Sequence, residues 1–143
     1  MYLIDTNVIS EARKHERANP GVRAFFEQVG AEDQPVFISV ITVGELRRGV
    51  ERIRHRGDTR QADRLEAWLT DILNEYRENI LDIDPDIAQL WGRLRVPHPE
   101  NALDKLIAAT ALLYDLTVVT RNHRDFAGTG VQVLNPFTEE QVS

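Results

Sequence analysis

The sequence predicts an α/β fold whose central parallel sheet has about five strands and is covered by helices on both faces. Short apolar runs that end at polar or turn-forming residues alternate with longer segments whose apolar residues recur every three or four positions. The short runs are typical of buried strands and the longer segments of amphipathic helices, so their alternation favours parallel strands joined by helices. At 143 residues, with no internal repeat or linker, we expect a single domain over residues 1–143.

Five segments are the expected strands. Each is rich in aliphatic or β-branched residues and is short, as buried strands are. In chain order they cover residues 2–4, 36–39, 80–83, 116–120 and 131–134. Asn135-Pro136 marks the turn that closes the last of them.

Six segments between these strands are the expected helices. Their apolar residues have helical spacing, and several start at a capping residue or a proline, such as Asp58 or Thr59 for the fourth and Asp84-Pro85 for the fifth. In chain order they cover residues 6–13, 20–33, 42–54, 59–78, 84–95 and 102–114. Pro97 and Pro99 forbid a helix between the last two, so that segment is expected to be a loop.

The composition excludes several kinds of function. The chain has no cysteine, which excludes a disulfide scaffold, a thiolate zinc site and a cysteine nucleophile. Its net charge of -6 argues against indiscriminate binding to nucleic acid but allows a local basic groove. The longest apolar stretch, residues 106–114, is far shorter than the roughly 20 residues of a membrane span. With no export leader visible before the first strand, we expect a cytoplasmic protein that does not bind membranes.

Four acidic residues lie where a strand or loop passes into the next element: Asp5, Glu45, Asp104 and Asp125. Asp5 directly follows the first strand, Glu45 lies one helical turn past the second, and Asp125 follows the fourth. In open parallel sheets, ligands bind beyond the carboxyl ends of the strands, where the strand order reverses. These three acids therefore have a physical reason to meet.

Asp104 is harder to place, because it lies in the first turn of the helix that leads into the fourth strand. Such a helix normally starts at the opposite edge of the sheet. Asp104 joins the other acids only if helix 84–95 runs back across the sheet and the loop with Pro97 and Pro99 redirects the chain. The spacing allows this path without fixing it.

Each acid also has a purely structural interpretation. Asp5, Thr6 or Asn7 could cap the first helix. Thr42-x-x-Glu45 and Asn101-x-x-Asp104 match capping boxes, and Asp125 could be a turn residue. If the acids do gather, they repel one another and raise each other's pKa, so a cluster predicts a bound cation or a basic group from a partner. Mg²⁺ and Mn²⁺ suit such a site, because hard cations prefer carboxylate oxygens.

Four ordered segments resemble the signature segments of PIN domains: residues 1–10, 38–46, 104–111 and 118–126. The resemblance is in particular to the VapC-type ribonuclease toxins of bacterial toxin–antitoxin pairs, including their FitB-like branch. It covers essentially the whole chain and implies a single PIN domain, with a three-layer α/β/α fold and strand order 3-2-1-4-5. It also implies an endoribonuclease that depends on Mg²⁺, with Mn²⁺ as a possible substitute.

By motif match, the resemblance assigns the metal site to Asp5, Glu45 and Asp104. Two residues compete for the fourth acidic position: Asn122 stands where many PIN domains carry an aspartate, and Asp125 is the nearest carboxylate. We include Asp125 among the candidate catalytic residues. Further residues are expected to orient a ligand carboxylate or to contact the substrate: Thr6, Thr120, Asn122, Arg121 and Arg124.

The resemblance also implies partners. It predicts a cognate VapB-like antitoxin, a homodimer, and a higher assembly on operator DNA through the antitoxin. Helices 42–54 and 59–78 are expected to offer that partner an exposed apolar face. The arginine-rich run 47–56 is either a solvated helix face or a contact for RNA phosphates or an acidic partner.

Two other functions compete with the ribonuclease. The first is a PIN-like module that binds RNA or protein without cutting it, which the asparagine at position 122 keeps open. The second is phosphoryl transfer through an aspartyl-phosphate, since a strand ending in aspartate is common to both chemistries. That reaction uses a second aspartate two residues later, where this chain has Asn7.

Overall fold

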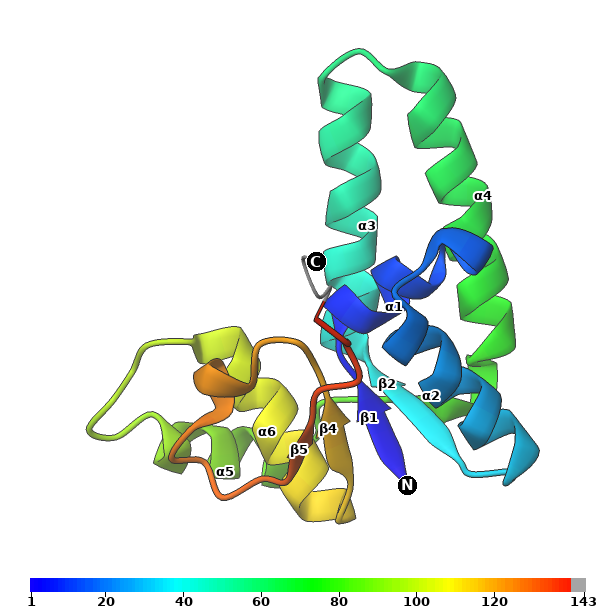
Figure 1. Ribbon diagram of the computed structural model, residues 1–143. Coiled ribbons are helices and arrows are strands. Elements are labelled where there is room, and N and C mark those ends of the chain that lie inside the picture. The colour runs from blue at the N-terminus through cyan, green and yellow to red at the C-terminus, as the bar shows by residue number, and fades with distance from the viewer. Residues whose placement is uncertain (140–143) are drawn as a thin grey trace.

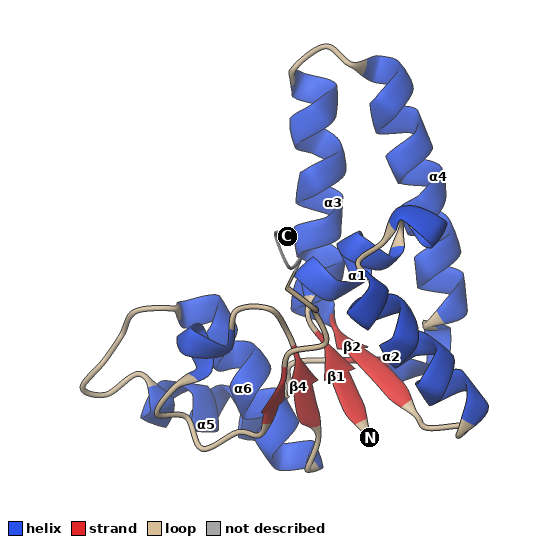
Figure 2. Cartoon of the chain, in the orientation of Figure 1, coloured by secondary structure: helices blue, strands red, loops and turns tan. Residues whose placement is uncertain are grey.

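The computed structural model describes residues 1–139, which form a five-stranded parallel sheet with helices on both sides (Figure 2). The strands are β1 (Tyr2–Ile4), β2 (Val36–Ser39), β3 (Ile80–Leu81), β4 (Thr117–Val119) and β5 (Val133–Leu134). Their order is β3-β2-β1-β4-β5, and every neighbouring pair is parallel. The predicted fold class and strand order are confirmed.

The last three strands are shorter than the segments 80–83, 116–120 and 131–134 that the sequence predicts. An edge strand has one neighbour, so its pairing ends where that neighbour ends. Leu81 of β3 pairs with Ser39, the last residue of β2, because the chain turns into a helix at Val40. β5 is shorter at its other end, because its pairing with β4 begins only at Val133, which pairs with Val118.

Helices cover both faces of the sheet (Figure 1). The first four are α1 (Thr6–Ala12), α2 (Pro20–Ala31), α3 (Val40–His55) and α4 (Thr59–Glu75), and the last two are α5 (Pro85–Leu94) and α6 (Ala102–Tyr114). Short 3₁₀ turns occupy His15–Arg17, Arg77–Asn79 and His123–Phe126 (η1, η2 and η3). Among the described residues, no helix is long and apolar enough to cross a membrane.

Alternating side chains of the strands build two separate cores, as expected where successive residues point to opposite faces. Ile4, Ile38 and Val119 belong to the core under α1 to α4, whereas Leu3 and Val118 belong to the core with α6. The sheet is therefore the middle layer of three, in agreement with the predicted α/β/α arrangement.

α3 and α4 form a long antiparallel hairpin that extends well past the carboxyl edge of the sheet (Figure 1). Gly57, with a φ of 89°, makes the turn between them, and Asp58 caps α4 as predicted. Near the sheet the two helices share the buried residues Leu46, Val50 and Leu69. Apolar burial contributes most to their association, because exposed ion pairs are worth little.

The chain reverses direction between β3 and β4, which decides where Asp104 lies. α5 runs away from the carboxyl edge, and a loop then carries the chain back so that α6 starts at that edge (Figure 1). Trp91 Nε1 donates a hydrogen bond to the carbonyl of Ala102 (2.8 Å), and Lys105 Nζ donates to the carbonyl of His98. These bonds tie the loop and α5 to the start of α6, so the reversal that Asp104 requires does occur.

Two helix starts differ from the expected capping boxes. α3 starts at Val40 rather than Thr42, with Ser39 as its N-cap, whose Oγ accepts a hydrogen bond from the Ile41 amide (3.0 Å). Thr42 is buried inside the helix, and among residues 1–139 its hydroxyl has no partner. Asn101 has a left-handed backbone (φ 56°) and makes no side-chain cap. The capping interpretation of Glu45 and of Asp104 is therefore wrong.

Candidate metal centre at the acidic edge of the sheet

Asp5 stands at the carboxyl end of the central strand β1 and is only 5% exposed. Its amide donates to the carbonyl of Val119 (2.9 Å), which fixes its backbone to β4. Its Oδ1 accepts from the Thr6 amide (2.9 Å), and its Oδ2 accepts from the hydroxyl of Thr120 (2.8 Å). Asp5 therefore caps α1, and a carboxylate with about four acceptor positions can still bind a cation.

Glu45 reaches the same edge from the second turn of α3. Thr6 Oγ1 donates to Glu45 Oε1 (2.8 Å), so the first residue of α1 holds the glutamate beside Asp5. Burial raises the pKa of Glu45, the Thr6 hydrogen bond opposes this, and the charge of Asp5 adds to it. The influence of Asp5 on Glu45 shows that the two carboxylates are neighbours.

Asn7 connects the acidic edge to the turn after β4, a role that the sequence pattern did not predict. Its Nδ2 donates to Asp5 Oδ2 (3.3 Å) and to Thr120 Oγ1 (3.2 Å), and its Oδ1 accepts from the amide of Arg121 (3.1 Å). Asn7 thus orients both the central acid and its threonine partner. The available signal was its place in the Asp5-Thr6-Asn7 run, which we interpreted only as a possible helix cap.

Asp104 and Asp125 approach from the other side, Asp104 from the first turn of α6 and Asp125 from η3. Burial, followed by the negative charges of Asp5, Asp125 and Glu45, raises the pKa of Asp104 to about 6. Burial also raises the pKa of Asp5, hydrogen bonds from Thr120, Thr6 and Asn7 lower it, and the charge of Asp125 raises it further. Asp104 is therefore within electrostatic reach of the other three acids.

The donor set has the chemistry that a hard divalent cation requires. Four carboxylates come from four separate elements, and in the described part of the chain none of them forms an ion pair with a lysine, arginine or histidine. Within residues 1–139, however, no group of three acidic or histidine side chains is arranged so that it could hold a metal ion. Side chains must therefore move inward for a cation to be coordinated.

Comparison with known proteins agrees with this architecture. The sequence model for the PIN domain matches residues 2–131. The chain belongs to the PIN domain family. It is 37% identical to Toxin FitB of Neisseria gonorrhoeae, with 96% of this chain and 99% of that protein aligned. It is 31% identical to VapC ribonuclease Y4jK of Sinorhizobium fredii, with 96% and 98% aligned.

Solved structures support the same assignment. The crystal structure of FitAcB from Neisseria gonorrhoeae superposes on this PIN domain with a TM-score of 0.81 and 35% identity, covering 95% of this chain and 98% of that one. A structure of FitAB bound to an IR36 DNA fragment gives a TM-score of 0.74 with 32% identity over the whole of both chains. The likeness extends over nearly the entire PIN domain.

Electrostatics favour Asp125 over Asn122 as the residue at the fourth acidic position. Asp125 is half-buried, and its charge raises the pKa of both Asp5 and Asp104. Asn122 is exposed and uses its backbone amide to donate to Thr120 Oγ1 (3.1 Å). Asn122 therefore supports the threonine that holds Asp5, while Asp125 supplies the fourth carboxylate.

The two expected phosphate contacts lie on the exposed turn after β4. The Arg121 guanidinium lies over the ring of Phe137, 4.8 Å from its centroid, and its charge lowers the pKa of Glu11. It is thus directed toward α1 and the C-terminal segment. Arg124 is exposed, and its side chain has no hydrogen bond or ion pair within residues 1–139.

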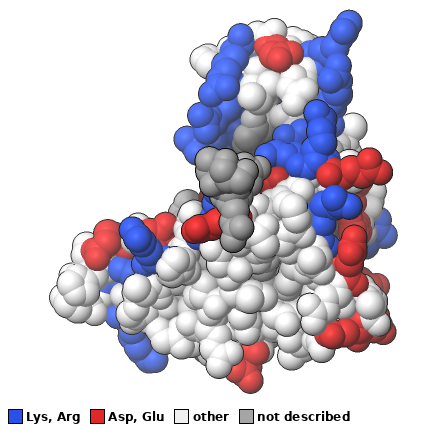
Figure 3. All heavy atoms as spheres, viewed as in Figure 1, with Lys and Arg blue, Asp and Glu red and all other residues white. Residues whose placement is uncertain are grey.

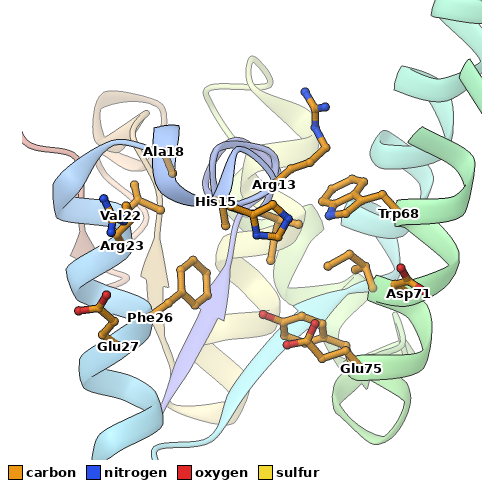
Figure 4. A pocket seen from close by; sticks show the side chains of 14 residues that line it. Arg13, His15, Ala18, Val22, Arg23, Phe26, Glu27, Trp68, Asp71 and Glu75 are labelled. Atoms are coloured by element: carbon orange, nitrogen blue, oxygen red, sulfur yellow. The ribbon is translucent and has the colours of Figure 1, made fainter. Parts of the chain in front are cut away.

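An apolar groove of about 470 Å³ lies between α1, η1 and α2 on one side and α4 on the other (Figure 4). Phe26 and Trp68 face each other across it, and charged residues such as Arg13 and Glu75 border it. A smaller hollow of about 270 Å³ shares Arg13 and Trp68 with this groove and reaches Thr6 and Glu45. The groove therefore leads to the acidic edge.

The groove lies elsewhere than the partner surface that we expected from the sequence. We expected helices 42–54 and 59–78 to present an exposed apolar face together. Leu46 and Val50 of α3 are instead buried, 5% and 2% exposed, because α3 packs on α1 and α4. The larger apolar surface is formed by α4 with α1 and α2.

Proposed function

We propose that this PIN domain is a metal-dependent endoribonuclease and the toxin of a type II toxin–antitoxin pair. One observation supports the activity most directly: four carboxylates from different elements gather at the carboxyl edge of a parallel sheet, and among the described residues none has a paired basic group. Divalent cations and phosphate substrates bind at such edges. The similarity to Toxin FitB and to VapC ribonuclease Y4jK supports the substrate class and the biological role.

In this proposal Asp5, Glu45 and Asp104 hold Mg²⁺ or Mn²⁺, and Asp125 is the fourth carboxylate of the site. When bound, such an ion would provide a water of lowered pKa and positive charge near the leaving oxygen. The residues around it set the geometry. Thr120 and Asn7 fix the Asp5 carboxylate by donating hydrogen bonds, and Thr6 does the same for Glu45.

The alternative is a PIN-like module that binds RNA or protein without cutting it. It is favoured by the finding that no three acidic or histidine side chains of residues 1–139 are arranged to hold a metal ion. Under that alternative, pure protein binds RNA in the presence of Mn²⁺ and leaves it intact.

A cognate VapB-like antitoxin is the proposed partner, and the apolar groove is its proposed binding site. Phe26 and Trp68 provide anchors for the apolar face of a partner helix, and the smaller hollow lets a basic side chain reach Glu45. Assembly on operator DNA through the antitoxin is supported by the FitAB structure with a DNA fragment. A homodimer is supported by α6, where Leu103, Leu113 and Tyr114 are 53%, 48% and 45% exposed.

The test is RNA cleavage by pure protein with Mg²⁺ or Mn²⁺, with and without a chelator. Cleavage is expected to require the metal and to fall by at least about a hundredfold in Asp5→Asn. Asp86→Asn is the matched control, because Asp86 is an exposed aspartate in the first turn of α5. Cleavage that survives both the chelator and Asp5→Asn would contradict the proposal, and RNA binding without cleavage would establish the alternative.

A further inference from the structure

The arginines of α3 and of its C-cap, Arg56, fall into two sets with different surroundings. Arg47 pairs with Glu51 (3.4 Å) and Glu66 (2.6 Å), and Arg54 pairs with Glu51 (2.9 Å) and with Asp63 and Glu66 (both 3.4 Å). This set faces α4 and is neutralised by acids. The second set is Arg48, Arg52 and Arg56, which we call the α3 arginine row. All three are exposed, and none of their side chains has a hydrogen bond or ion pair within residues 1–139.

The α3 arginine row starts at the acidic edge and runs along the hairpin. Its members are four residues apart and share a helix face with Glu45, which precedes Arg48 by three residues. The charge of Arg48 acts on Glu45, so the first member lies beside the acids. From Glu45 to Arg56 the row extends about 16 Å, at 1.5 Å per residue.

The surface around the row is hollowed and basic. Arg48, Arg52 and Arg56 line a shallow depression of about 330 Å³ together with Glu51 and His55. Basic side chains line both long edges of the α3–α4 hairpin (Figure 3). A chain with a net charge of -6 thus concentrates unpaired positive charge on the part of α3 that leaves the acidic edge.

The row has an energetic cost for the folded protein. Like charges four residues apart on a helix repel one another, and here no acid of the described residues pairs with them. The neighbouring set shows that acids of α3 and α4 are placed to pair with other arginines of the same helix. A polyanion that lies along the row would remove this repulsion and release counterions.

We propose that Arg48, Arg52 and Arg56 bind the phosphates of the RNA strand on one side of the cleaved bond, leading it from the acidic edge along α3. The proposal rests on the ribonuclease function proposed above and adds a substrate path to it. A partner helix would need apolar anchors, which the other groove provides in Phe26 and Trp68 and the row does not. Arginine suits phosphate because its planar fork can donate two parallel hydrogen bonds.

The test compares two double variants that remove the same charge. Arg52→Gln with Arg56→Gln changes the row and leaves Arg48 beside Glu45 intact. Arg60→Gln with Arg64→Gln is the matched control, because these arginines of α4 are also exposed, four residues apart and without an ion pair within residues 1–139. Both variants are assayed for cleavage of a single-stranded RNA on the order of 20 nucleotides, and for binding of that RNA in a chelator at several salt concentrations.

The row variant is expected to raise KM about tenfold and to leave kcat within about twofold, because it removes phosphate contacts away from the reacting atoms. The slope of log K against log salt should become less negative by about 1.4, at roughly 0.7 per lost contact with a single strand. The control variant should match the wild type in both. The variant Arg52→Lys with Arg56→Lys should keep most of the binding that the glutamine variant loses. A trinucleotide too short to reach the row should be cleaved equally by all variants.

Equal losses in the two double variants would overturn the proposal, because they would indicate a diffuse effect of net charge. An unchanged KM and salt slope in the row variant would overturn it as well, and so would an effect confined to the binding of an acidic protein partner. Failure of the proposed function is a separate result, namely no cleavage by the wild type with metal present. In that case the salt dependence of RNA binding still decides whether the row binds phosphates.

Discussion

The two sides of the acidic edge differ in how their carboxylates are held. Asp5 and Glu45 accept hydrogen bonds from Thr6, Asn7 and Thr120, so their positions are set by the fold. Asp104 and Asp125 have no side-chain hydrogen bond or ion pair in the part of the chain that the structure describes. We call the first pair the fixed side and the second pair the open side.

The difference teaches how one site can combine stability with affinity for a cation. Donors on the fixed side lower the cost of burying charge, while the open side keeps negative charge that nothing in residues 1–139 offsets. Uncompensated carboxylates destabilise a metal-free fold and favour a cation that neutralises them. The predictions below test this contrast, beginning with the largest effect.

Asp104→Asn should reduce RNA cleavage by on the order of a thousandfold, because it removes a proposed metal ligand from the open side. The same change should raise the melting temperature of the metal-free protein at pH 7.5 by about 3 °C, or roughly 1 kcal/mol once solvent screening is allowed for. The gain arises because burial, and then repulsion by three other acids, disfavours the ionised form of Asp104. Assays of cleavage and of thermal unfolding check both effects, and a lower melting temperature would contradict the contrast.

Asp125→Asn and Asn122→Ala test which of the two residues fills the fourth acidic position. We expect Asp125→Asn to lower cleavage by about a hundredfold and Asn122→Ala by less than about threefold, because Asp125 is the carboxylate that acts on Asp5 and Asp104. Initial rates at saturating Mn²⁺ measure the two effects. The reverse ranking would move the fourth position to Asn122.

Thr120→Val tests the fixed side. Thr120 is fully buried and donates to Asp5, so valine leaves the Asp5 carboxylate without that donor. Cleavage should fall about tenfold, as for other residues that orient a ligand. Chemical unfolding should show a loss of about 1–2 kcal/mol. This loss is opposite in sign to the gain expected for Asp104→Asn, and a stability gain in both variants would remove the distinction between the two sides.

The stability of the metal-free protein should fall as the pH rises from 5 to 7. The pKa of Asp104 is raised from 3.8 to about 6, so between these values the folded state binds more protons than the unfolded state. Its favourable contribution is full below 3.8 and is lost as the pH passes 6. Melting curves at intervals of pH measure the slope, which should be smaller in Asp104→Asn, and an identical slope in both proteins would contradict the assignment.

The sheet was predictable because the sequence signals for its strands and helices lie within each element. Apolar runs and capping signals located the strands and most helices, and the carboxyl-edge rule brought Asp5, Glu45 and Asp125 together. The start of α3 was misjudged because Ser39 and Thr42 are both good caps, and it is Ser39 that accepts the capping hydrogen bond from the Ile41 amide. The position of Asp104 depended on a reversal of the chain, which the residue pattern permitted and the family resemblance implied.

Contacts between side chains that lie far apart in the chain could not be predicted from the sequence. Asn7 meets Thr120 and Arg121 only because β1 and β4 are adjacent, and nothing in its local sequence indicates this. The division of the α3 arginines likewise depends on which of them face the acids of α4. Periodicity defines the faces of a helix, but only the packed structure shows what lies opposite each face.

Titration of Mn²⁺ into wild type and Asp104→Asn by calorimetry at pH 6 tests the central claim most directly. The wild type should bind the ion and release about half a proton from Asp104, whose pKa of about 6 leaves it half-protonated. Buffers of different ionisation enthalpy measure that release, and Asp86→Asn should behave as the wild type. Asp104→Asn should show neither tight binding nor this proton release. Equal binding by Asp104→Asn and the wild type, or binding by neither, would contradict a metal centre completed by the open side.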